Sequence, residues 1–182
     1  MIKDAIEIME RVGIEIEPGL SAEEFKKIES VYGISFPEKW KELLMMVLPI
    51  SKGFYNWRDF STENISYIKS ILNQPFEGIA GYANEVEWCE QWGDSPGDSE
   101  KIAIEVKWRL RDAPKLIPVY SHRFVPMIDS NDPPVLSVHG TDVIRYGNDL
   151  EDYFRREFLK AKKNNTQLAE EIEFIPFWSE IM

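Results

Sequence analysis

The chain has 182 residues, 43% of them apolar and 13% aromatic, and it carries 32 acidic against 21 basic side chains, a formal net charge of −11. This composition predicts a globular domain with its own core and argues against a disordered chain. The negative charge disfavours nucleic-acid binding, which depends largely on neutralising phosphates. No apolar run approaches the roughly 18 residues of a membrane span, and one cysteine excludes an internal disulfide. We expect a cytoplasmic protein.

The N-terminal part of the chain reads as helices joined by short turns. Apolar residues at helical spacing predict a helix over residues 2–12, and alternation over residues 14–17 predicts a short strand. Ser21 with Glu24 forms a capping-box pattern, so a second helix is expected to begin there. Gly33 is suited to the left-handed conformation that ends such a helix.

Pro37 is placed to open a third helix, led by Trp40, because its missing N–H would be unpaired there anyway. The aromatic segment 53–57 predicts a strand, and a capped helix is expected to run from about residue 61 to residue 72. Residues 74–97 contain several glycines and prolines and are predicted to be irregular.

Strand patterns dominate the C-terminal half. Asp98 is expected to cap a helix that ends before Pro114. The predicted strands cover residues 116–120, 121–125, 135–139 and 143–146. Residues 147–149 should cap a further helix, and a helical tail over residues 166–182 is expected to pack back through Phe174, Phe177 and Trp178.

Helices that precede a strand cluster, without strict alternation, predict an α+β fold. We expect a single domain over residues 1–182, with a mixed, mainly antiparallel sheet and helices packed around it. Its central part spans about residues 21–158, and the N-terminal helix and the C-terminal tail pack on that part.

Residue types for catalysis are sparse. Ser121, His122 and Asp142 could supply a nucleophilic triad, which would make the chain a small hydrolase, but no G-x-S-x-G turn surrounds the serine. A structural or interface role for His122 is the favoured interpretation. His122, His139 and Cys89 lack the paired spacings of a zinc site. The sequence therefore predicts no catalytic residue, no cofactor and no metal.

Residues 82–97 combine aromatic residues with a field of carboxylates. Such aromatic anchors are typical of protein interfaces, and the carboxylates would steer a basic partner. The alternative is that the tryptophans complete the core and the acids are their solvated neighbours. The candidate partner-binding residues are Tyr82, Glu85, Glu87, Trp88, Glu90, Trp92 and Asp94.

The G-x-x-F-P-x-x-W pattern resembles the opening motif of the SUKH superfamily, which contains yeast cell-wall-synthesis regulators and many bacterial immunity proteins. The resemblance extends to the later strands and to the helix after Gly147. Its motif residues, all structural, are Gly33, Phe36, Pro37, Trp40, Gly53, Pro118, Gly147 and Asp149.

The resemblance implies a non-catalytic domain that binds other proteins. The expected function is that of a bacterial immunity protein, which neutralises a cognate toxin by direct binding. The expected partner is a basic protein, a nuclease toxin, bound by a monomer or a weak homodimer. The alternative is a regulatory scaffold for cell-wall-synthesis or signalling proteins.

Overall fold

The computed structural model describes residues 2–159 and 173–182. Two short strands, β1 (Ile16–Pro18) and β2 (Val47–Pro49), form one antiparallel sheet. The larger sheet is an antiparallel meander in the order β3-β4-β5-β6. Its strands are β3 (Leu116–Tyr120), β4 (Arg123–Pro126), β5 (Val135–His139) and β6 (Asp142–Gly147). The predicted α+β class is confirmed, and all strand pairs in the described part of the chain are antiparallel.

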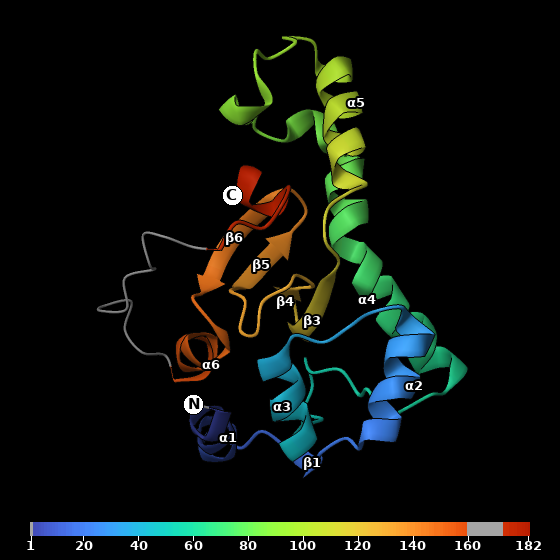
Figure 1. Cartoon of the computed structure of the whole chain (residues 1–182), viewed down its shortest axis with the longest axis vertical. Coiled ribbons are helices and arrows are strands. Elements are labelled where there is room, and N and C mark those ends of the chain that lie inside the picture. Colours follow the sequence, from blue (N-terminus) through green and yellow to red (C-terminus); the bar gives the residue numbers. More distant parts are fainter. Residues whose placement is uncertain (1, 160–172) are drawn as a thin grey trace.

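The described residues also form six α-helices. They are α1 (Ile2–Arg11), α2 (Ala22–Tyr32), α3 (Glu38–Met46), α4 (Thr62–Gly81), α5 (Ser99–Leu110) and α6 (Leu150–Phe158). In Figure 1, α1, α2, α3 and α6 lie at one end of an elongated molecule, whereas the second half of α4 and α5 reach the other end. We call residues 76–110, from this half of α4 through α5, the arm.

The predicted helix boundaries at the caps are confirmed. Ser21 and Glu24 form both hydrogen bonds of a capping box at the start of α2, and Gly33 ends that helix in the left-handed conformation. Asp98 and Asp149 accept hydrogen bonds from the first-turn N–H groups of α5 and α6. These caps depend on contacts between residues two or three apart, which is why the sequence alone predicts them.

The large sheet buries both of its faces, and neighbouring residues on its strands enter different cores. Ile117 and Val119 belong to a core shared with α1, α2, α3 and α6, which also contains Trp40. Leu116 and Phe124 belong to a second core, formed with the end of α4, with α5 and with the C-terminal tail. The second core is therefore what joins the arm to the sheet.

Residues 53–57 are not a strand, contrary to the prediction. Gly53 has a φ of +103°, and the N–H of Phe54 donates to the carbonyl of Ser51 as in a turn. The Gly53 carbonyl accepts a hydrogen bond from the N–H of Ser121, but the segment is not one of the strands of either sheet. A side chain at Gly53 would come within 2.4 Å of the Tyr120 ring, which explains the glycine. The aromatic character of the segment reflects burial instead, because Phe54, Tyr55 and Trp57 all enter the core.

The helix α4 continues to Gly81, although residues 74–97 were predicted to be irregular. Pro75 removes one intrahelical hydrogen bond, but it is buried together with Leu72 and Ile79, and this packing offsets the loss. Gly78 does not end the helix. It lies where the β5–β6 turn packs closely against α4, since a Cβ at this position would be 3.3 Å from Gly140.

The C-terminal tail is described only from residue 173 onward, and the helix predicted from residue 166 lies largely outside the described residues. Residues 173–182 contain a single 3₁₀ turn, Trp178–Glu180, in place of the expected helix. Phe177 and Trp178 are buried as predicted. Phe174 is exposed, so the expectation that it packs onto the body was wrong.

Arg58 joins the start of α2 to β1, and this contact predicts a pH dependence. Its Nε lies 2.6 Å from Glu24 Oε1 and its Nη1 lies 2.9 Å from Glu17 Oε2. The hydrogen bond from Arg58, followed by that from the Ser21 N–H, lowers the pKa of Glu24 from 4.5 to about 2. Because the lowered pKa belongs to the folded state, the stabilisation is present above pH 4.5 and is lost as the pH falls toward 2.

We therefore expect Glu24→Gln to lower the free energy of unfolding at pH 7, with a difference from the wild type that disappears on acidification. Glutamine can still cap the helix, so the substitution isolates the charge. Urea unfolding over a pH series measures the effect. The control is Glu23→Gln, which removes an exposed neighbouring carboxylate. A constant difference between Glu24→Gln and the wild type down to pH 2 would contradict the assignment.

Candidate functional site

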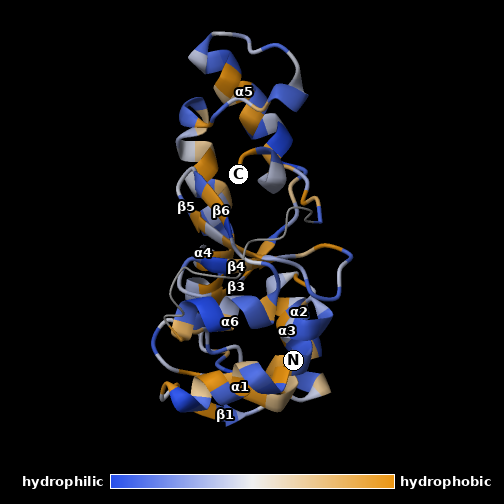
Figure 2. Ribbon diagram, turned by 90° about the vertical axis from the view of Figure 1, so that its left-hand side faces the viewer, coloured by the Kyte–Doolittle hydropathy of each residue, from blue (hydrophilic) through white to orange (hydrophobic). Residues whose placement is uncertain are grey.

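The predicted partner-binding residues lie at the end of the arm, in the connection between α4 and α5. We call residues 82–98 the tip; it contains two short 3₁₀ turns, Ala83–Glu85 and Glu90–Trp92. Ala83 and Val86 are buried in the same core as Val106 of α5, and this packing fixes the tip on the arm. Figure 2 shows blue, hydrophilic segments at the end of the arm beside orange, hydrophobic segments of α5.

Two tryptophans of the tip form a small aromatic cluster. The rings of Trp88 and Trp92 meet edge to face, with centroids 5.3 Å apart. Trp92 stacks on Phe177 of the tail and donates from Nε1 to Glu180 Oε2 at 2.8 Å. Trp88 donates to the carbonyl of Gly93 within the tip itself. Trp92 therefore holds the tail against the tip, and both tryptophans are half-buried.

The carboxylates of the tip are all on the surface. Glu85, Glu87, Glu90 and Asp94 are exposed. None of these four forms an ion pair with any residue that the structure describes, whereas Glu105 further along α5 pairs with Arg109 at 2.9 Å. Unpaired carboxylates crowded at one end of an elongated molecule produce a local negative field, which attracts cations and basic surfaces.

The sequence analysis missed two apolar residues of α5. Ile104 is 69% exposed and Trp108 is 51% exposed. Their spacing of four residues places them on one side of the helix, apart from the buried Val106 and Leu110. Two large apolar residues, four apart and off the core-facing stripe, were the available signal. Together with Tyr82, which is 55% exposed, they give the arm apolar surface next to its charge.

Ser121 and His122 lie in the turn of the hairpin between β3 and β4. Tyr120 pairs with Arg123, so Ser121 and His122 form a two-residue turn, in which a positive φ such as the +50° of Ser121 is usual. Ser121 Oγ lies 3.2 Å from Nδ1 of its neighbour, His122. Burial, followed by the charge of Arg123, lowers the pKa of His122 and favours the neutral ring.

The titratable residues that the structure describes are not gathered into a metal site. In the described ranges, no group of three or more histidine, cysteine, aspartate or glutamate side chains could hold a metal ion. Nor do these ranges include a helix with both the length and the apolar character that a bilayer span requires.

Comparison of the chain with protein-family models, with curated proteins and with solved structures finds no match.

Proposed function

We propose that the chain is a non-catalytic, cytoplasmic protein-binding domain that presents the tip of its arm to a basic protein. The observation that carries the proposal is the set of four exposed carboxylates near the half-buried Trp88 in the sequence. These carboxylates, Glu85, Glu87, Glu90 and Asp94, have no ion-pair partner among the described residues. Long-range charge would bring the partner to the tip, and the aromatic surface would hold it.

The biological role that we propose is neutralisation of a basic toxin, such as a nuclease. A nuclease must bind a polyanion, so its surface is typically positive, and an acidic inhibitor competes for that surface. The resemblance to the SUKH superfamily supports this role. A regulatory scaffold would use a similar surface with a different partner, so the identity of the bound protein distinguishes the two roles.

Replacing Glu85, Glu87 and Glu90 by lysine is expected to slow association with the partner and to reverse or flatten its salt dependence. Charge steering acts mainly on the association rate, and salt screens it with a Debye length of about 10 Å at 0.1 M. The partner is first captured from native lysate on the wild-type chain and identified. Surface plasmon resonance at several salt concentrations then measures the rates.

The matched control replaces three exposed glutamates at the opposite end of the molecule, Glu7, Glu10 and Glu15, by lysine. It therefore changes the net charge by the same amount. It should bind nearly as the wild type does. Trp88→Ala should instead speed dissociation, as the loss of an anchor does. An acidic partner, or equal effects of the two triple variants, would refute the proposed surface.

A further inference from the structure

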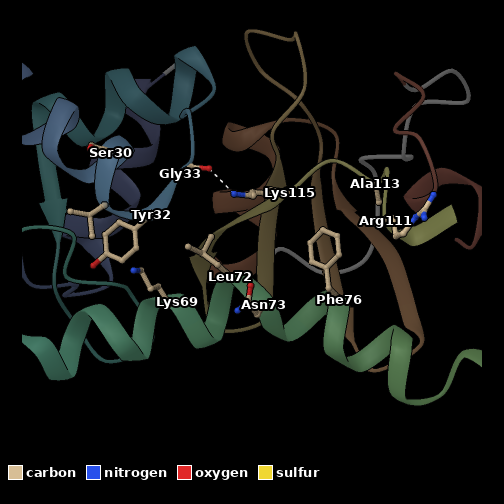
Figure 3. Close-up of a pocket in the computed structure, with 11 residues that line it drawn as sticks. Ser30, Tyr32, Gly33, Lys69, Leu72, Asn73, Phe76, Arg111, Ala113 and Lys115 are labelled. Atoms are coloured by element: carbon tan, nitrogen blue, oxygen red, sulfur yellow. Dashed lines mark hydrogen bonds between the residues drawn. The ribbon is translucent and has the colours of Figure 1, made fainter. Parts of the chain in front are cut away.

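A hollow of about 600 Å³ lies between α2, α4 and the segment that joins α5 to β3 (Figure 3). Leu72 and Phe76 of α4 provide apolar surface, and Lys69, Arg111 and Lys115 provide charge. Its volume falls within the roughly 300–1,000 Å³ of sites that bind small molecules. We call this hollow the basic groove.

The basic groove concentrates positive charge in an acidic protein. Three cationic residues line it and no aspartate or glutamate does, although the chain carries a net charge of −11. Among the described residues, Lys69, Arg111 and Lys115 have no carboxylate partner within 4.0 Å. An anion bound beside these cations would be stabilised by their opposite charge.

The two lysines and the arginine mark opposite ends of the groove. Lys115 donates from Nζ to the carbonyl of Gly33 at 2.8 Å, which holds its ammonium at the end of α2 and leaves two further N–H donors. Figure 3 shows Lys69 and Lys115 on the side of Tyr32 and Gly33, and Arg111 on the far side. The apolar side chains of Leu72 and Phe76 lie between these ends.

We propose that the basic groove binds a small organic anion. Its carboxylate or phosphate is held by Lys69 and Lys115, and its apolar body, best a flat aromatic one, lies against Leu72 and Phe76. An inorganic anion would leave the apolar surface unused, and a neutral apolar molecule would leave the cations unpaired. The site is independent of the proposed protein partner, because none of its lining residues belongs to the tip.

Four probes test this chemistry: 1-naphthaleneacetate, 1-naphthyl phosphate, the neutral 1-naphthaleneethanol and inorganic phosphate. Titrations followed by ¹H–¹⁵N correlation spectra should show saturable shifts at the non-proline amides of residues 30–33, 69–76 and 111–115 with the two aromatic anions. The neutral alcohol and inorganic phosphate should bind at least about tenfold more weakly, since each lacks one half of the interaction. The stronger of the two aromatic anions identifies the preferred head group.

Lys69→Gln should weaken binding of the aromatic anions. The double variant, which combines Lys69→Gln with Lys115→Gln, should raise the Kd by about tenfold or more. Lys26→Gln, an exposed lysine elsewhere on α2, is the matched control and should change nothing. Because Lys69 is exposed, its variant should fold normally, which its spectrum verifies. Absence of saturable shifts with both aromatic anions, equal binding of the neutral alcohol, or insensitivity to both variants would overturn the proposal.

Discussion

Replacing Trp40 by alanine is expected to lower the free energy of unfolding by about 3–5 kcal/mol, the range for deleting a large aromatic side chain from a core. Trp40 is only 2% exposed, and it shares its core with Phe25, Leu44 and the sheet residues Ile117 and Val119. Alanine there would leave a cavity where the helices meet the sheet. Urea unfolding followed by circular dichroism measures the loss.

Two variants make this prediction specific. The buried Nε1 of Trp40 finds no acceptor among the described residues, so Trp40→Phe loses no hydrogen bond and relieves an unsatisfied donor. We expect Trp40→Phe to lower the free energy of unfolding by about 1 kcal/mol or less. Phenylalanine leaves a smaller cavity than alanine does, and removing the unsatisfied N–H offsets part of the cost of that cavity. Trp108→Ala, at an exposed tryptophan, should stay within about 0.5 kcal/mol of the wild type. Equal losses for Trp40→Ala and Trp108→Ala would refute the core assignment.

Local signals in the sequence were sufficient for most of the fold. The caps at Ser21, Asp98 and Asp149 and the left-handed Gly33 depend on neighbouring residues, and all are present. Pro118, one of the expected structural motif residues, lies in β3, an edge strand of the sheet, beside a shift in register. A proline is tolerated there because its missing N–H can face away from the ladder.

The errors arose where distant contacts outweigh local preference. Pro75 and Gly78 are helix-breaking residue types, yet α4 continues through both. Pro75 is buried, and Gly78 lets the β5–β6 turn pack closely against the helix. The aromatic segment 53–57 is buried without pairing as a strand. In each case the deciding partner is far away in the chain, so propensity and periodicity could not reveal it.

The candidate site was also only partly predictable. The two interpretations of the tip tryptophans, core and interface, were left equal; both side chains are half-buried in the structure, but their partners differ. Trp92 is tied to Phe177 and Glu180, more than 80 positions away in the chain, whereas Trp88 bonds only within the tip. The basic groove gave no signal at all, because Lys69, Arg111 and Lys115 come from separate segments that only the fold brings together.

Trp178→Ala is expected to cost about 3–5 kcal/mol and, unlike Trp40→Ala, to loosen the tip. Trp178 is fully buried, meets Phe76 of α4 edge to face at 5.5 Å and donates from Nε1 to the carbonyl of Pro114 at 2.9 Å. Its neighbours in the tail, Phe177 and Glu180, hold Trp92. Hydrogen exchange should therefore accelerate at residues 88–93 in Trp178→Ala more than in Trp40→Ala.

Phenylalanine separates packing from hydrogen bonding at the two buried tryptophans. Trp178→Phe leaves the half-buried Pro114 carbonyl without its donor, and a fully buried acceptor left unpaired would cost about 1–3 kcal/mol. Trp40→Phe leaves no acceptor unpaired. Trp178→Phe should therefore lower the free energy of unfolding by at least about 1 kcal/mol more than Trp40→Phe does. Phe174→Ala, at an exposed residue of the same tail, should be nearly neutral. If Trp178→Phe and Trp40→Phe cost the same, the hydrogen bond to Pro114 contributes nothing to holding the tail, and the packing of Trp178 in the second core holds it instead.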